Sequence, residues 1–201
     1  MKKTVYVTSY AVKYVGDECD LSFAPPMMKR RFSPLQKVAF SLLNAVAPKG
    51  SAPKTVFASR DGEVKLTHEL VGAFNAGDGV SPWKFSSSVY NAAPGLYSVY
   101  SGNRSTYTAI AAGDETIEDS LIEAMFEDGG SAWCYTEEDG GGYGLAARFE
   151  DSLAGGRAEM KVEIGSGNPE NPEMTFSGLS GFFRGECGEL AGKRLALKRV
   201  G

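Results

Sequence analysis

Few residues in this sequence could carry covalent chemistry. The chain has a single histidine, His68, and three widely spaced cysteines, Cys19, Cys134 and Cys187. A general base must reach its nucleophile, and no GxSxG turn or comparable elbow is present beside His68. We therefore interpret His68 as a solvated helix residue and expect neither a Ser-His-Asp nor a Cys-His-His site.

The cysteines also lack the surroundings of a reactive thiol. Cys134 lies between large apolar residues in the stretch 132–135, which is typical of an inert buried side chain. Cys187 follows a glycine-rich segment, and Arg184 is the only nearby cation that could activate it. A thiol-dependent acyltransferase or hydrolase that uses Cys134 or Cys187 with His68 remains an alternative.

An acidic cluster is followed directly by a glycine-rich stretch. The acidic residues are Glu137, Glu138 and Asp139, and the glycine-rich stretch is 140–144. A calcium loop would need further oxygen ligands at fixed positions, and these do not follow. The glycines lack the GxGxxG order and the strand-to-helix setting of a dinucleotide site. We interpret the segment as a flexible turn with a solvated charge cluster, and we expect no metal site and no cofactor.

Charge and hydropathy limit the kinds of binding partner and the cellular compartment that the sequence allows. The net charge is -4, and basic residues accumulate only at Lys29, Arg30 and Arg31, so no nucleic-acid surface is expected. The longest apolar stretch, 38–47, is about half the roughly 20 residues of a membrane-spanning helix. The odd cysteine count without CxxC pairs indicates reduced thiols, and hence a cytoplasmic protein with no membrane span.

The periodicity predicts an α/β protein. With 201 residues the chain can bury an apolar core without disulfide or metal staples, so one domain over 1–201 is expected. Ser33 and Pro34 are typical of a helix start, and Thr116 to Asp119 resembles a capping box. Strands are predicted at 4–12, 55–59, 105–111, 131–136, 143–149, 157–164 and 195–197, and helices from 33, over 66–74, over 86–100 with a kink at Pro94, and from 116.

Two segments carry a family resemblance. Residues 80–95, VSPWKFSSSVYNAAPG, resemble the "SP..F...V.NA..G" stretch of β-ketoacyl synthases, and residues 57–63, FASRDGE, are similar to the turn after the second strand in that family. The element order also resembles one half of the duplicated thiolase fold. The resemblance implies a truncated thiolase-like fold, with one βαβαβαββ half over about 1–164, a mixed sheet flanked by helices, extra C-terminal strands and an irregular tail over 165–201.

Among β-ketoacyl synthase-like proteins, the chain resembles the short chain length factors of aryl polyene biosynthesis. In an active ketosynthase the nucleophilic cysteine follows the third strand, and the equivalent place here is Gly113 and Asp114. The two catalytic histidines of the family belong to a second half that this chain is too short to contain. The resemblance therefore implies a protein that is not an enzyme.

The resemblance also implies a partner. A chain length factor pairs with an active β-ketoacyl synthase as a heterodimer, shapes its acyl tunnel in polyene, polyketide or fatty-acid-like biosynthesis, and meets acyl carrier protein indirectly. The interface strand would comprise Ser105, Thr106, Tyr107, Thr108, Ala109 and Ile110, and the residues facing the tunnel would be Phe85, Val89, Ala92 and Ala93. Two alternatives stay open: that these four are ordinary core residues, or that the chain is a stand-alone scaffold whose Lys29, Arg30 and Arg31 bind acyl carrier protein.

Overall fold

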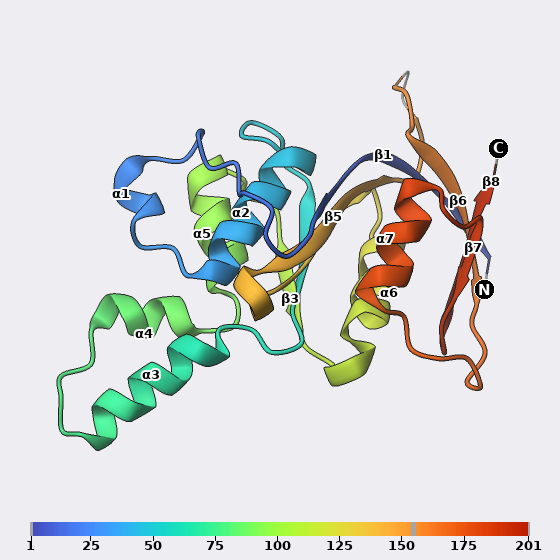
Figure 1. Ribbon diagram of the computed structural model, residues 1–201. Coiled ribbons are helices and arrows are strands. Elements are labelled where there is room, and N and C mark those ends of the chain that lie inside the picture. The colour runs from blue at the N-terminus through green and yellow to red at the C-terminus, as the bar shows by residue number, and fades with distance from the viewer. Residues whose placement is uncertain (1, 154–155, 201) are drawn as a thin grey trace.

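The computed structural model describes residues 2–153 and 156–200, which form one eight-stranded sheet between helices (Figure 1). The strands are β1 (Lys3–Lys13), β2 (Lys54–Ala58), β3 (Tyr107–Ile110), β4 (Ser131–Glu137), β5 (Tyr143–Glu150), β6 (Met160–Ser166), β7 (Glu189–Ala191) and β8 (Leu195–Val200). The helices are α1 (Pro26–Lys29), α2 (Pro34–Val46), α3 (Val64–Asn75), α4 (Pro82–Ser88), α5 (Ala92–Ser101), α6 (Thr116–Phe126) and α7 (Phe176–Arg184), with 3₁₀ turns η1 (Gly113–Glu115) and η2 (Asp139–Gly141).

The sheet has the order β3-β2-β4-β5-β1-β6-β8-β7. β2 pairs in parallel with β3 and with β4, and the other pairs are antiparallel, so the predicted mixed sheet is confirmed. Strands β1 to β5 with their connecting helices form the predicted βαβαβαββ half, and β6, β8 and β7 extend the sheet.

Strand alternation divides the core into two layers. On β4, Ala132 and Cys134 belong to the layer beneath α2 and α5, whereas Trp133 and Tyr135 belong to the layer beneath α6 and α7. Trp133 is fully buried, and its indole N–H donates to the Ser120 hydroxyl on α6 at 2.8 Å. This bond helps to fix α6 against its face of the sheet.

The start of α2 forms as the sequence predicts. The Ser33 hydroxyl accepts from the backbone N–H of Gln36, and the Gln36 side chain accepts from the backbone N–H of Ser33. Pro34 occupies the first helical position, where its missing N–H costs nothing. The capping box therefore fixes where α2 leaves the preceding loop.

The predicted single helix over 86–100 is wrong. The chain forms α4 and α5 instead, separated by an extended backbone at Val89 with ψ of 145°. Pro94 does not kink a helix interior, because it lies in the first turn of α5, where an N–H needs no intrahelical acceptor. Helices α3 and α4, with the loop between them, form an arm over residues 64–88 that projects from the body (Figure 1).

The capping box predicted at Thr116 is also wrong. The 3₁₀ turn η1 runs directly into α6, and the N-cap position falls on Glu115, which makes no side-chain cap. The Thr116 hydroxyl instead donates to the carbonyl of Gly113 at 2.7 Å and accepts from the N–H of Ala112 at 2.8 Å. Thr116 therefore stabilises the turn before the helix.

The tail predicted as irregular over 165–201 contains α7, β7 and β8 within residues 165–200, so that prediction is wrong there, and residue 201 lies outside the described residues. The last strand, predicted at 195–197, is confirmed. Thr175 caps α7 by accepting from the N–H of Gly178 at 3.1 Å, and α7 buries Leu179, Phe182 and Phe183 against the sheet. The nearly fully buried Glu118 of α6 accepts the N–H groups of residues 193, 194 and 195 at 3.2, 2.6 and 2.5 Å. Tertiary contacts of this kind leave no signal in the local sequence.

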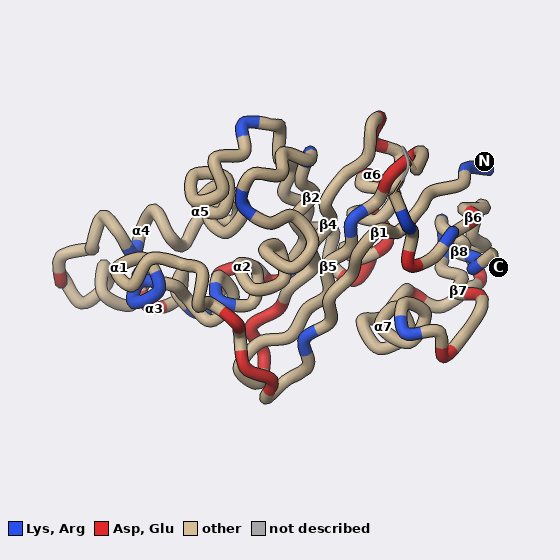
Figure 2. The backbone as a smooth tube through the Cα atoms, turned by 90° about the horizontal axis from the view of Figure 1, so that it is seen from above, with Lys and Arg blue, Asp and Glu red and all other residues tan. Residues whose placement is uncertain are grey.

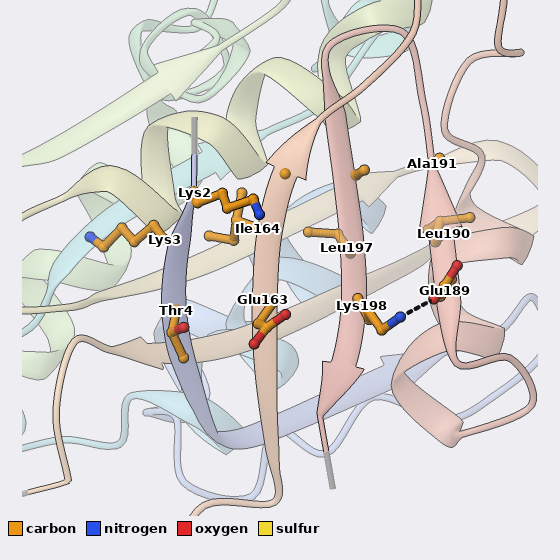
Figure 3. Close-up of a pocket in the computed structure, with 12 residues that line it drawn as sticks. Lys2, Lys3, Thr4, Glu163, Ile164, Glu189, Leu190, Ala191, Leu197 and Lys198 are labelled. Carbon is orange, nitrogen blue, oxygen red and sulfur yellow. Dashed lines mark hydrogen bonds and ion pairs between the residues drawn. The ribbon is translucent and has the colours of Figure 1, made fainter.

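On the added strands β6, β8 and β7, the sheet face opposite α7 is open and shallow (Figure 3). A cross-strand row of Thr4, Glu163, Lys198 and Glu189 crosses it, with Lys198 Nζ 2.6 Å from Glu189 Oε1. The next row contains Gly165, Ala196 and Ala191, whose small side chains leave a hollow of about 500 Å³. This hollow reflects small side chains at the sheet edge farthest from β3.

Candidate functional site

Strand β3 forms one edge of the sheet and pairs only with β2 within the described residues. The carbonyls of Thr106 and Ile110 accept from the N–H groups of Thr55 and Ser59, at 3.1 and 3.5 Å. Because backbone groups alternate along a strand, the N–H and C=O groups of Tyr107 and Ala109 face away from β2. These are the backbone groups that a further strand would bind.

The predicted interface strand is shorter than expected. Ser105 and Thr106 lie before β3, so their assignment to the strand is wrong. The N–H of Ser105 bonds to Asn103 Oδ1 at 2.9 Å and its hydroxyl donates to the carbonyl of Ala52 at 2.8 Å, which holds this segment in a turn. Residues Tyr107 to Ile110, including Thr108, form the edge.

The turn that joins β3 to α6 contains Gly113 and Asp114, both in η1. This is the strand-to-helix setting predicted for the missing nucleophile, and Gly113 has φ of 58°, which favours glycine. The residues from 111 to 116 include neither cysteine nor histidine. A thiol nucleophile is therefore not provided at this turn.

A small cavity of about 200 Å³ lies beside the turn. Its lining combines Gly113, Asp114 and Thr116 with Arg60, Tyr135 and Tyr143, and the segment 173–176 at the start of α7 completes it. The carboxyl ends of β2, β3 and β4 meet here, where α/β sheets usually bind ligands. Burial raises the pKa of the Tyr135 hydroxyl, so that side chain stays neutral.

Glu137 organises the loop after β2, and its interpretation as a solvated charge is wrong. The residue is 1% exposed and accepts from the N–H of Arg60, from the Ser59 hydroxyl at 3.1 Å and from the N–H of Asp61 at 3.4 Å. Burial raises the pKa of Glu137, and the Arg60 and Ser59 donors oppose that rise. The sequence prediction ended the strand at residue 136 and assigned Glu137 to the hairpin loop, whereas Glu137 is the last residue of β4.

Tyr90 connects the ends of β2 and β3. Its hydroxyl accepts from the N–H of Ser59 at 2.9 Å and lies against the carbonyls of Ser59 and Ile110. Gly62, with φ of 59°, allows this approach, because a Cβ there would lie 2.8 Å from the Tyr90 ring. Sequence reasoning missed Tyr90, since a lone tyrosine carries no spacing signal.

The four residues predicted to face a tunnel do not share one helix face. Phe85 on α4 and Val89 in the break are 62% and 42% exposed. Ala92 and Ala93 on α5 are buried, and Ala93 belongs to the core beneath α2. Only Phe85 and Val89 are therefore available to another chain.

The structure does not assemble a thiol site. Cys134 is fully buried, and burial raises the pKa of its thiol, which is opposite to the activation of a nucleophile. His68 is exposed on α3, and Cys187 lies after α7. Within residues 2–153 and 156–200, no group of three or more His, Cys, Asp or Glu side chains could hold a metal, and no helix is long and apolar enough to cross a membrane.

The basic segment Lys29 to Arg31 lies at the end of α1, next to the α3–α4 arm (Figure 2). Arg31 lies over the ring of Trp83 at 5.0 Å from its centroid. Arg30 and Arg31 are exposed and make no ion pair with a described residue. They remain free to bind an anionic group.

Comparison with known proteins decides the family. The family described as β-ketoacyl synthase, N-terminal domain, matches residues 8–129, which is more than half of the chain. The chain belongs to this family. The matched region runs from β1 to the end of α6, and so includes the β3 edge and the Gly113–Asp114 turn. No curated protein matches the sequence.

Solved structures show the same fold. The β-ketoacyl synthase-like chain superposes with a TM-score of 0.76 on a chain of the complex of the ketosynthase ApeO with its chain length factor ApeC from Xenorhabdus doucetiae, at 15% identity, with 98% of this chain and 99% of that chain covered. A second match is the ishigamide ketosynthase/chain length factor, with a TM-score of 0.55 and 11% identity. The alignment covers 78% of this chain and 55% of that one. The predicted truncated thiolase-like fold is thus confirmed.

Proposed function

We propose that this chain is a non-catalytic ketosynthase-like subunit, a chain length factor, that pairs with an active β-ketoacyl synthase and shapes its acyl tunnel. The observation that carries the proposal is the turn after β3. It has the strand-to-helix setting of a ketosynthase nucleophile, but Gly113 and Asp114 occupy it. A chain without a nucleophile there needs a partner to take part in acyl condensation.

The edge of β3 supports the pairing. Tyr107 and Ala109 direct backbone donors and acceptors away from β2, and Tyr107 is 38% exposed. Edge strands with free backbone groups bind further strands, and in the family the third strands of two subunits pair edge to edge. The two structural neighbours are described as ketosynthase and chain length factor assemblies, which agrees with this proposal.

Phe85 and Val89 are the residues we assign to the partner's acyl tunnel. Both are apolar, both are exposed, and Val89 lies two residues before Asn91, whose side-chain amide donates to the Tyr107 hydroxyl at 3.4 Å. Val89 therefore lies close in sequence to a residue that contacts the edge strand, and Phe85 precedes Val89 by four residues on α4. Buried apolar walls are what an acyl chain requires.

Co-expression with a ketosynthase from the same gene neighbourhood tests the pairing. Size exclusion and mass analysis should show a stable one-to-one complex, formed through the β3 edge. A soluble monomer that binds none of the ketosynthases offered would contradict the proposal. The resemblance leads us to expect an aryl polyene as the product. Analysis of the material that the complex releases identifies the acyl product.

A further inference from the structure

The break between α4 and α5, residues 89–91, contacts both ends of the edge strand β3. At the first residue of β3, the Asn91 side-chain amide donates to the Tyr107 hydroxyl at 3.4 Å. At the last residue, the Tyr90 hydroxyl lies against the carbonyl of Ile110. Two consecutive residues of the break therefore hold a strand of four residues at its start and at its end.

Strand β3 has few other contacts that hold it in place. Within the described residues it pairs with β2 alone, in parallel and over four residues. Parallel pairing is slightly weaker per residue than antiparallel pairing, and segments with few buried contacts open first. A shift of one residue would also turn every side chain of β3 to the other face of the sheet. Contacts from outside the sheet therefore contribute directly to the position of β3.

The Tyr90 hydroxyl is in turn bound to the residue that follows β2. It accepts from the N–H of Ser59 at 2.9 Å and also lies against the carbonyl of Ser59. The Ser59 hydroxyl donates to the buried Glu137 carboxylate at 3.1 Å, so the anchor of Tyr90 is itself tied to β4. Burial raises the pKa of Tyr90 to about 12, so the hydroxyl keeps the proton that it donates.

Packing fixes both tyrosine side chains. The Tyr90 ring makes an edge contact with Phe57 of β2, with 6.2 Å between the ring centroids. It also lies against Gly62, where a Cβ would come within 2.8 Å of the ring. Gly95 of α5 leaves similar room for Tyr107, because a Cβ there would lie 3.3 Å from the Tyr107 hydroxyl. The two hydroxyl groups therefore have defined positions at the two ends of β3.

We propose that Tyr90 is a positioning residue for subunit pairing: together with Asn91 it holds β3 in the one register in which a ketosynthase strand binds the outer edge of β3. The inference rests on the proposed function, in which that edge pairs with the partner. Tyr90 acts without touching the ketosynthase, since the backbone groups of Tyr107 and Ala109 make the new hydrogen bonds. A strand that is already in place binds without the cost of ordering it first.

The test is the binding kinetics of the whole chain with a purified ketosynthase from the same gene neighbourhood. Tyr90→Phe keeps the ring and removes the hydroxyl, so β3 should be out of position for part of the time. The association rate constant should fall by about fivefold, because only the ordered fraction binds, and the dissociation rate constant should change little. Tyr100→Phe is the matched control. It removes a hydroxyl that donates to the carbonyl of Phe23 at 3.4 Å, and it should change neither rate constant.

Two further measurements separate positioning from a general effect on folding. In the free chain, hydrogen exchange at the amides of Thr108 and Ile110, which face β2, should be faster in Tyr90→Phe and unchanged in Tyr100→Phe. Asn91→Ala removes the contact at the other end of β3. Because the Asn91 side chain is exposed and does not cap α5, this variant keeps the fold, and its association rate constant should fall by about twofold.

The outcomes distinguish this inference from the proposed function. An unchanged association rate constant for Tyr90→Phe, in a chain whose parent binds the ketosynthase, would overturn the inference and leave the pairing intact. A change confined to the dissociation rate constant would also overturn it, because Tyr90 would then contact the partner directly. A parent chain that binds no ketosynthase would contradict the proposed function, and this inference with it.

Discussion

At the scale of single residues, the notable groups are carboxyl groups that the fold buries. Glu63 and Glu137 are acidic side chains in a protein whose net charge is already -4, yet both are almost inaccessible. Burial raises the pKa of each, and hydrogen bonds from Ser33 and Gln36 or from Arg60 and Ser59 oppose the rise. Such groups make folding depend on pH.

The free energy of unfolding should fall as the pH rises. Glu63 titrates at about 7 in the folded chain, against an ordinary value of 4.5, so the folded state holds the proton more tightly. The resulting stabilisation is complete at acidic pH and is lost between about pH 4.5 and 7, with a size on the order of 2 kcal/mol. Urea unfolding at pH 5.5 and pH 8 measures it.

Glu63→Gln is the matched variant for that measurement. It removes the titrating proton and keeps an oxygen for Ser33 and Gln36, so the variant should be more stable than the parent chain at pH 8 and less dependent on pH. Some dependence should persist, because Glu137 shifts in the same direction. A variant with the same pH dependence as the parent chain would refute the role of Glu63.

Val89 tests the assignment of the acyl tunnel. In the complex with an active ketosynthase, Val89→Trp should shorten the product, because a larger side chain reduces the space for the acyl chain. The control is Val71→Trp on α3, where Val71 is 52% exposed and outside the proposed tunnel. Mass spectrometry of the released products compares the two, and equal product lengths would refute the assignment.

At the scale of elements, the added strands β7 and β8 depend on α6. Glu118 accepts three backbone N–H groups, from residues 193 to 195, and Arg194 pairs with Glu115 and Asp119 at 2.5 and 2.7 Å. Because a buried acceptor of three N–H groups cannot be replaced by water, this carboxylate links the C-terminal hairpin to the β-ketoacyl synthase-like half.

Glu118→Ala should therefore destabilise the chain by roughly 2–4 kcal/mol. Glu123→Ala, an exposed position on the same helix, is the control and should have little effect. Thermal unfolding of the two variants measures the difference. Equal melting temperatures would show that the hairpin does not depend on Glu118.

The elements also show how far the sequence predicts the fold. Periodicity and the Ser33 cap located β1, α2, β2, β4 and β5, because their signals are local. The break between α4 and α5 was missed, because Pro94 is compatible with either a kink or a helix start. The helix and strands within 165–200 were largely missed as well, since they depend on tertiary contacts such as those of Glu118. Of the site, the turn at Gly113 was predicted and the buried groups were not.

The edge of β3 can be tested without changing the core. Ala109→Pro removes an N–H that faces away from β2, and proline is tolerated on edge strands. The variant should keep the melting temperature of the parent chain within a few degrees but lose binding to the ketosynthase partner. Size exclusion of the co-expressed pair measures this, with Thr108→Val as a control that keeps every backbone donor.

At the scale of the whole molecule, the proposed function makes this chain one subunit of a two-subunit ketosynthase. The molecule has an open sheet edge and a strand-to-helix turn without a nucleophile, and its family is that of β-ketoacyl synthase N-terminal domains. These features are consistent with the proposal that acyl transfer takes place on another subunit and that this chain supplies part of the tunnel wall. Basic residues at α1 and an arm over 64–88 add surfaces that the pairing strand does not use.

The most direct measurement is the mass of each subunit after the co-expressed pair has been loaded with an acyl thioester. We expect the ketosynthase to gain the mass of one acyl group and this chain to gain none. The Cys134→Ala and Cys187→Ala variants should leave that loading unchanged. An acyl group found on this chain, removed by either substitution, would contradict the non-catalytic role and favour a thiol enzyme.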